Sequence, residues 1–241
     1  MRVAVLSDIH ANVHALEAVL AAADADNVDA VWCLGDLVGY GPQPNRCVAL
    51  VAERAALCLA GNHDLAAIEK LPLAMFNGDA GTAVRWTSGV LDPAARAFLS
   101  GLAPTASIDG VELFHGSPLD PIWDYVLSEH AAEASFRATT APLVLVGHSH
   151  AQLALSWNGR RVSGGVARDG DRVAIDHGRH LLNPGSVGQP RDDDARAAWL
   201  VLDTTAGHAT FHRTAYPVAA TQAEIRERGL PESLASRLSG S

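Results

Sequence analysis

Short apolar runs alternate with amphipathic stretches over the first 60 residues. The valine-rich run from Arg2 to Leu6 predicts a buried strand. Asn12 can cap the helix that follows, because apolar residues recur after it at helical spacing. A second strand, a glycine- and proline-rich loop, a helix and a third strand come next, over 30–34, 35–44, 45–53 and 57–60. This order predicts βαβ units and a largely parallel sheet.

The rest of the chain changes from helices to strands. The segment from about 63 to 102 is predicted to be helical, with Asp92 as a cap and Pro93 at the first helical position. Beyond it, strands joined by tight turns dominate, and Asn158-Gly159 is a strong hairpin signal. The expected elements are strands over 111–115, 143–146, 152–157, 161 onwards, 172–175, 198–203 and 208–212, with helices near 128–138 and from 221. We expect one domain over 1–241, with two sheets, helices outside and a peripheral polar tail from about 221.

Composition excludes several classes of protein. Of the 241 residues, 48% are hydrophobic and 19% are charged, which argues against wholesale disorder and against a coiled coil. No apolar run approaches the roughly 20 residues of a membrane helix, and the first run is too short for a signal peptide. The three cysteines lack CxxC spacing, which indicates reduced thiols. We therefore expect a cytoplasmic protein.

The charge balance bears on the partner. The net charge is −9, from 18 Lys and Arg against 27 Asp and Glu. This balance argues against broad binding to duplex nucleic acid or to an anionic membrane, but it allows a local pocket charged by metal ions. A small molecule is therefore the expected partner.

Side chains that can bind metal follow five predicted strands, at the point where each strand ends. Ligands bind at the carboxyl ends of strands in open α/β sheets, so these side chains can converge on one crevice. Carboxylate, imidazole and amide oxygen together suit Mn, Fe, Co, Ni or Zn better than Ca. Seven ligands are too many for one four-coordinate zinc and suit two ions about 3.5–4 Å apart that share a carboxylate. The seven candidates are Asp8, His10, Asp36, Asn62, His115, His148 and His150.

Other catalytic motifs are missing. Lys70 is the only lysine and follows Glu69, so no Walker A sequence exists. The sequence around Ser186 lacks the first glycine of a nucleophile elbow.

The order of the motifs resembles that of the calcineurin-like metallophosphoesterases, with the closest likeness to the small bacterial and archaeal YfcE-like branch. The likeness spans nearly the whole chain and includes Asp8-x-His10, Gly35-Asp36, Gly61-Asn62-His63-Asp64, His115-Gly-Ser-Pro118, Gly147-His148-x-His150 and Asn183-Pro-Gly-Ser-Val-Gly-Gln-Pro-Arg191. The resemblance implies a four-layer α/β/β/α sandwich of two mixed sheets and a dinuclear metal centre, with manganese favoured and Fe, Ni, Co or Zn as alternatives. It also implies that a homodimer is an expected assembly.

The resemblance implies a role for each motif residue. One metal would be held by Asp8, His10 and His150, and the other by Asn62, His115 and His148, with Asp36 bridging them. A hydroxide bound between the metals would attack phosphorus, and His63 would protonate the leaving oxygen. Asp64 would orient the loop or that histidine.

One departure narrows the function. Gly35-Asp36 continues as Leu-Val-Gly-Tyr-Gly and lacks the Asp-Arg-Gly of the protein Ser/Thr phosphatases, which argues against a protein phosphatase. Arg191 is a candidate for binding the substrate phosphate, and a surface arginine is the alternative interpretation. The sequence therefore favours a phosphodiesterase for nucleotides, cyclic nucleotides or dinucleoside polyphosphates such as diadenosine tetraphosphate. The alternatives are a broad phosphomonoesterase, a nuclease on short single strands, a single-metal binding protein and a catalytically silent scaffold.

Overall fold

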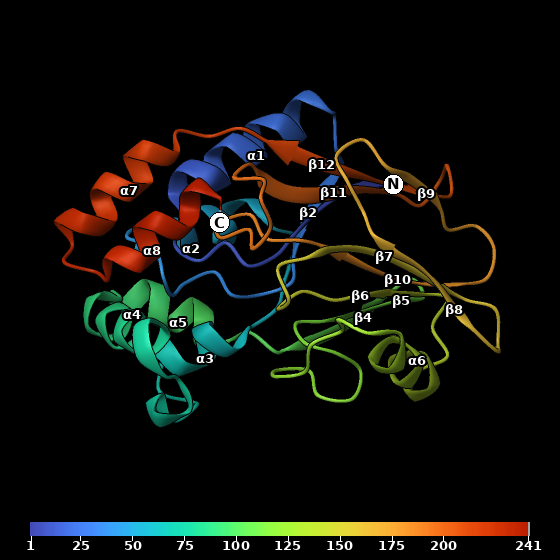
Figure 1. Ribbon diagram of the computed structural model, residues 1–241, viewed down its shortest axis with the longest axis horizontal. Helices are drawn as coiled ribbons and strands as arrows, with labels where there is room; N and C mark the ends of the chain where they lie inside the picture. The colour runs from blue at the N-terminus through green and yellow to red at the C-terminus, as the bar shows by residue number, and fades with distance from the viewer. Residues whose placement is uncertain (241) are drawn as a thin grey trace.

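Two six-stranded β-sheets packed face to face form the centre of the protein, whose computed structural model describes residues 1–240 (Figure 1). The first sheet contains β1 (Arg2–Leu6), β2 (Ala30–Cys33), β3 (Leu57–Cys58), β9 (Arg172–Ala174), β11 (Ala197–Asp203) and β12 (His208–Thr214). The second contains β4 (Thr105–Ile108), β5 (Val111–Phe114), β6 (Leu143–Leu145), β7 (Gln152–Trp157), β8 (Val162–Val166) and β10 (Arg179–Pro184). The strand orders are β3-β2-β1-β11-β12-β9 and β4-β5-β6-β10-β7-β8.

Both sheets are mixed, as the family resemblance implied. Strands β1, β2 and β3 run parallel, but β1 pairs with β11 in antiparallel orientation, and β11 pairs with β12 in the same way. The expectation of a largely parallel sheet is therefore wrong for half of this sheet. The β11–β12 pairing has a local reason, because a short turn joins these two strands into a hairpin, and a hairpin is antiparallel.

The main core lies between the sheets. Val3 and Val5 of β1 face inward with Leu200 and Phe211 of the same sheet, and Leu145 packs against them from the second sheet. Side chains alternate along a strand, so Ala4 and Leu6 of β1 point to the opposite face of the sheet and pack against the helices outside. Burying one such aliphatic side chain contributes about 1.5–3 kcal/mol to folding.

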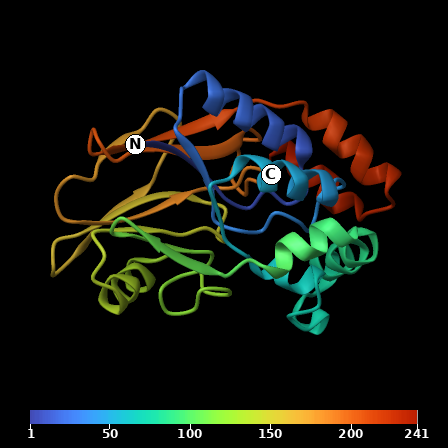
Figure 2. The same ribbon diagram turned by 180° about the vertical axis from the view of Figure 1, so that it is seen from behind.

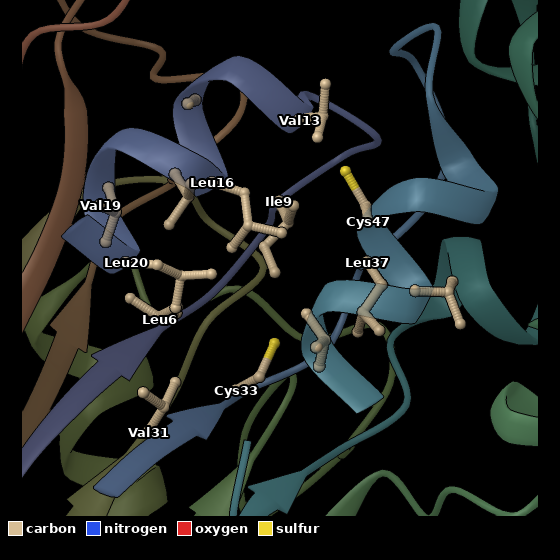
Figure 3. Close-up of a cluster of buried hydrophobic side chains, with 14 of the residues drawn as sticks. Leu6, Ile9, Val13, Leu16, Val19, Leu20, Val31, Cys33, Leu37 and Cys47 are labelled. Carbon is tan, nitrogen blue, oxygen red and sulfur yellow. The ribbon is translucent and has the colours of Figure 1, made fainter. Parts of the chain in front are cut away.

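Helices cover the outer face of each sheet and one end of the sandwich (Figures 1 and 2). They are α1 (Val13–Ala25), α2 (Pro44–Arg54), α3 (Asn62–Ala67), α4 (Gly78–Val90), α5 (Pro93–Ser100), α6 (Glu129–Ala138), α7 (Val218–Glu227) and α8 (Glu232–Ser236), with short 3₁₀ helices η1 (Leu73–Met75) and η2 (Arg237–Ser239). Figure 3 shows Leu16 and Leu20 of α1 and Cys47 of α2 above Leu6 and Cys33 of the first sheet. On the far side, α6 packs on the second sheet. The four-layer α/β/β/α sandwich is thus confirmed.

The predicted helix caps are present. The Asn12 side chain accepts a hydrogen bond from the amide of Ala15 at the start of α1, at 3.2 Å. Asp92 accepts one from Ala95 at 2.8 Å, and Pro93 follows it at the start of α5. None of the helices within residues 1–240 has the length and apolar character needed to cross a membrane.

Two strands and the end of the chain differ from the sequence prediction. Strand β4 lies at an edge and is only half-buried, so its apolar signal is weak. Strand β10 lies inside the second sheet, but its arginine, histidine, asparagine and proline hide it from a hydrophobicity pattern. The tail forms α7, which begins at Val218, and α8, and both helices bury apolar side chains.

Candidate metal centre

The loops that follow β1, β2, β3, β5 and β6 bring all seven predicted metal ligands together at one end of the sandwich. Each loop begins where a buried strand stops, so the backbone of the core fixes where the polar side chains start. All seven side chains are buried, with no more than 4% of any residue exposed. The seven side chains thus lie together at the strand ends where the sequence analysis expected them to converge.

The seven residues form two groups with Asp36 between them. The ligand atoms of Asp8, His10 and His150 lie within 4.8 Å of one another, and so do those of Asp36, His115 and His148. Oδ2 of Asp36 lies 3.7 Å from Nε2 of His10 and 3.5 Å from Nε2 of His115. Oδ1 of Asn62 joins the second group, 3.1 Å from Nε2 of His115. One Asp36 oxygen can thus reach both groups.

Backbone carbonyl groups fix the protonation of three histidines. Nδ1 of His10, His115 and His150 lies 3.1, 2.9 and 2.6 Å from a carbonyl oxygen of another loop. A carbonyl oxygen only accepts hydrogen bonds, so Nδ1 carries the proton and Nε2 carries a lone pair. Nε2 of His10 and Nε2 of His150 lie 3.0 Å apart, so two lone pairs face each other. Metal-binding histidines have this arrangement, in which one ring nitrogen donates a hydrogen bond to the protein and the other nitrogen binds the metal.

The buried polar atoms of the site test whether the residues fit metal ions. Oδ1 of Asp8 and Nε2 of His148 are buried and have no hydrogen-bond partner. Unpaired buried charges are unfavourable by several kcal/mol, and two carboxylates, Asp8 and Asp36, lie in this site. Divalent cations would remove both problems, because they accept these lone pairs and neutralise the carboxylates. The carboxylate, imidazole and amide donors thus fit two borderline transition-metal ions.

The electrostatics keep the histidines in their ligand form. Burial lowers the pKa of His10 and His115 and brings that of His148 to about 3, so all three are neutral near pH 7. Burial alone would raise the pKa of Asp8, but the neighbouring imidazoles, His150 foremost, hold it below its usual range. Burial, and then the nearby carboxylates Asp64 and Asp8, raise the pKa of Asp36.

The backbone of the site is strained. Five of the seven predicted ligands have left-handed backbone conformations, with φ between 49° and 61°: Asp8, His10, Asp36, His148 and His150. Non-glycine residues in such conformations raise the free energy by about 1–3 kcal/mol each and persist where surrounding structure enforces them. Close packing adds to this constraint. A side chain at position 61 would overlap the Asp36 carboxylate, so only glycine fits there.

His63 and Asp64 stand in the first turn of α3, beside the two groups. The amide of His63 donates a hydrogen bond to Oδ1 of Asp36 at 2.9 Å. Asp64 accepts hydrogen bonds from the amides of Gly61 and Val38, so it joins the loops after β2 and β3. Burial raises the pKa of Asp64 to about 7. Geometry also places a His63 nitrogen within 4.8 Å of ligand atoms of His10 and Asp36, so distance alone does not separate an acid from a ligand here.

A cleft of about 170 Å³ opens over this cluster. Its floor is polar, and its walls include four aromatic residues, Tyr40, Phe76, Trp123 and Tyr125. The ring of Tyr125 stacks on that of His148, with centroids 4.0 Å apart, and Tyr125 is 41% exposed. Arg191 also lines the cleft. Sequence reasoning missed the aromatic walls, because Phe76, Trp123 and Tyr125 lie in irregular loops that no motif marks.

The sandwich and its buried cluster of carboxylates and imidazoles have the donor set of a metal-binding protein. The model of the calcineurin-like phosphoesterase superfamily domain matches residues 1–207. The chain therefore belongs to this superfamily, as its motifs predicted.

Known proteins resemble the chain over almost its whole length. The uncharacterized protein MJ0912 of Methanocaldococcus jannaschii is 34% identical over 243 residues, which cover 98% of this chain and 96% of that protein. The crystal structure of a metallophosphoesterase from Sphaerobacter thermophilus has 42% identity and a TM-score of 0.91, covering 100% of this chain and 99% of that one. The hypothetical protein PH1004 from Pyrococcus horikoshii OT3 shares the fold, with a TM-score of 0.82 at 19% identity over 99% of this chain and 98% of its own. Superfamily membership implies a phosphoester hydrolase that uses divalent metal ions.

Proposed function

We propose that the protein is a phosphodiesterase with two divalent metal ions, manganese favoured, that hydrolyses small phosphorylated molecules. The observation that carries the proposal is the position of Asp36, whose Oδ2 lies within 3.7 Å of histidine nitrogens from both ligand groups. Asp8, His10 and His150 would hold one ion, and Asn62, His115 and His148 the other.

The chemistry follows from the donor set. When bound, a pair of divalent cations supplies a water of lowered pKa and positive charge that offsets charge in the transition state. Asn62 is a neutral donor, so it limits the negative charge that an anionic substrate meets. His63 lines the cleft and would protonate the leaving oxygen, a role worth about 10²–10⁴-fold in rate.

The protonation of His63 depends on the substrate. Burial, and then neighbouring imidazoles, lower the pKa of His63, so the ring is neutral in the free cleft at pH 7. A bound phosphate brings negative charge next to the ring, and negative charge raises the pKa of a histidine. Substrate binding would therefore help to load the proton that His63 donates.

The cleft favours a diester that carries a planar group. Among the described residues that line it, Arg191 is the one arginine and there is no lysine. The phosphate group that is attacked carries one negative charge in a diester or inside a dinucleoside polyphosphate, and this lining accommodates one charge there better than the two of a monoester. The aromatic walls offer rings on which a nucleobase can stack. Asn77 lines the same cleft, and its side chain makes no capping hydrogen bond to α4. We therefore propose nucleotide diesters or dinucleoside polyphosphates as substrates, with Arg191 binding a phosphate.

The first experiment compares hydrolysis of bis-p-nitrophenyl phosphate and p-nitrophenyl phosphate, with Mn²⁺ and then with chelator. Chelator-sensitive release that favours the diester is the expected result. Faster release from the monoester would replace the diesterase by a phosphomonoesterase. Two bound metals without activity on either compound would contradict a diesterase that accepts simple diesters. A chain with neither metal nor activity would be a catalytically silent scaffold.

A further inference from the structure

The imidazole of His63 has no hydrogen-bonding partner at Nδ1, although this atom is buried. The backbone of Gly39 lies directly against it, and a side chain at position 39 would overlap Nδ1. Gly39 also has a φ of +87°, a conformation that other residues rarely adopt. Gly39 therefore occupies the space beside Nδ1 and offers this atom no side-chain partner.

Aromatic rings surround His63 instead. The ring centroid of Tyr40 lies 4.5 Å from that of His63, and the ring of Phe76 stands edge-on at 4.9 Å. Tyr40 also contacts His10, with centroids 4.7 Å apart. Tyr40 is only 9% exposed and holds a left-handed backbone with φ of 61°. The buried ring of Tyr40, which is carried by a strained backbone, thus contacts both the proposed acid and a proposed metal ligand.

The two C-terminal helices form the other side of the Tyr40 environment. Helix α7 lies next to α1 and α8 packs on α7 (Figure 1), and both helices lie beyond the residues that the superfamily model matches. The space between these helices, Tyr40 and His10 is about 10 Å³, no more than one water molecule occupies. Tyr40 belongs to one buried apolar cluster with Ala83 of α4 and five residues of the C-terminal segment, Ile225, Leu230, Leu234, Ala235 and Leu238.

Hydrogen bonds attach α7 to the loops of the site. The hydroxyl of Thr221 donates to Oδ1 of Asn12 at 3.0 Å, in the loop after β1. Nε2 of Gln43 donates to Oε2 of Glu224 at 2.8 Å, and Gln43 ends the loop after β2. These are the loops that carry His10 and Tyr40, so α7 is fixed relative to both.

We propose that Tyr40 is the positioning residue for His63 and that α7 and α8 hold Tyr40 in place. The C-terminal helices thereby set the rate of the chemical step, although they contribute no ligand. This inference rests on the proposed function, in which His63 is the general acid. An acid assists only when it is aligned with the leaving oxygen, and a misplacement of about 1 Å can lower a rate about 10²-fold.

A double-mutant cycle between Tyr40 and His63 tests the proposal. With saturating Mn²⁺ and a dinucleoside monophosphate, whose leaving group is an alkoxide, Tyr40→Leu should lower kcat about tenfold or more and leave KM within about twofold. Tyr40→Phe keeps the ring and should restore turnover. In a His63→Ala background, Tyr40→Leu should have no further effect, because it acts through the missing imidazole. A further tenfold loss in the double variant would overturn the proposal.

A second pair of variants tests the C-terminal helices. Leu238→Ala removes a buried side chain of η2, which packs on α7 and α8 behind Tyr40, and Leu181→Ala removes a buried side chain of the second sheet. Both should lower the midpoint of thermal unfolding, but only Leu238→Ala should lower kcat, and only while His63 is present. Equal effects of the two variants on kcat would refute the role of the helices.

The metal-free protein supplies a readout that does not depend on activity. In histidine-labelled protein with chelator, the NMR signals of the His63 ring are assigned by their loss in His63→Ala. They should move in Tyr40→Leu and Leu238→Ala, because the Tyr40 ring shifts or disappears, and stay in place in Leu181→Ala. Unmoved signals would overturn the positioning role. Wild-type protein without chelator-sensitive turnover would instead contradict the proposed function, while the NMR comparison would still decide the contact.

Discussion

Among single residues, Asp36 connects the most parts of the site, because its two oxygens do different work. Oδ1 accepts the hydrogen bond from the His63 amide, and Oδ2 faces both histidine groups. Asp36→Asn keeps the size of the side chain but removes its charge and one acceptor oxygen. We expect the variant to retain fewer than one Mn²⁺ per chain after desalting, measured by elemental analysis, and the wild-type protein to retain two. Asp109→Asn, in an exposed turn, is the matched control, and two ions retained by Asp36→Asn would contradict the bridging role.

A variant of His63 distinguishes a general acid from a metal ligand. His63→Ala should leave two metal ions bound and lower kcat about 10²–10⁴-fold with an alkoxide leaving group, because a general acid contributes about this much. The effect should be smaller with p-nitrophenolate, which leaves without protonation. Since distances also group His63 with His10 and Asp36, metal analysis is decisive. Loss of one ion in His63→Ala would make His63 a ligand.

Tyr125 should govern recognition of the planar part of the substrate. One face of its ring is stacked on His148, and the residue is 41% exposed beside the cleft, so it can stack a base. Adenosine monophosphate should inhibit more strongly than ribose 5-phosphate, which lacks the base. Tyr125→Leu should weaken inhibition by the nucleotide about tenfold and leave ribose 5-phosphate unchanged, as expected for loss of one stacking contact. Tyr125→Phe is the control, and equal inhibition constants for the two compounds would contradict a base-binding wall.

At the scale of elements, the sequence predicted the strand ends better than the sheets. The ends of β1, β2 and β6 were visible because valine- and leucine-rich runs stop abruptly at Asp, Gly or His, and those ends carry the site. The Asn158-Gly159 hairpin signal correctly joined β7 and β8 as an antiparallel pair. The other pairing partners were not visible, because a strand's sequence does not state its neighbour's direction. Strand β10 was missed because polar residues interrupt its apolar pattern. One of them, Asn183, donates a hydrogen bond to the carbonyl of Gly147 beside the ligand loop, at 2.7 Å, so the residue that hides the strand also supports the site.

Asn12 shows how one cap serves several elements. Its Oδ1 accepts from the amide of Ala15 and the hydroxyl of Thr221, and its Nδ2 donates to the carbonyl of Gly188 at 2.9 Å. Asn12→Ala removes a helix cap and leaves buried donors without partners, so it should lower the free energy of unfolding by about 2 kcal/mol or more. Urea unfolding measures this loss. Thr82→Ala, whose exposed hydroxyl bonds only within α4, should change it by less than about 0.5 kcal/mol.

For the whole molecule, the buried site couples folding to pH. Between about pH 5 and 7, the relevant groups of the site are four histidines whose pKa is lowered, His10, His63, His115 and His148, and two carboxyls whose pKa is raised, Asp36 and Asp64. The pKa of Asp8 is lowered from 3.8, so Asp8 is ionised in the folded and in the unfolded chain over this interval. Below the ordinary histidine pKa of 6.5, the unfolded chain binds more protons at these imidazoles than the folded chain, so acid lowers stability. The two carboxyls act in the opposite direction between about pH 4 and 7, because the folded chain keeps their protons.

Four groups against two predict that chelated protein loses stability as the pH falls from 7 to 5. Bound metal should add about 2.7 kcal/mol at a free concentration of 100 times the dissociation constant. This gain should disappear over the same pH interval, because protons compete with the metal for imidazole. Thermal unfolding at pH 7, 6 and 5, with Mn²⁺ and with chelator, measures both effects. A chelated sample that is more stable at pH 5 than at pH 7 would show that the carboxyls outweigh the histidines, and would contradict the neutral-imidazole site on which metal binding depends.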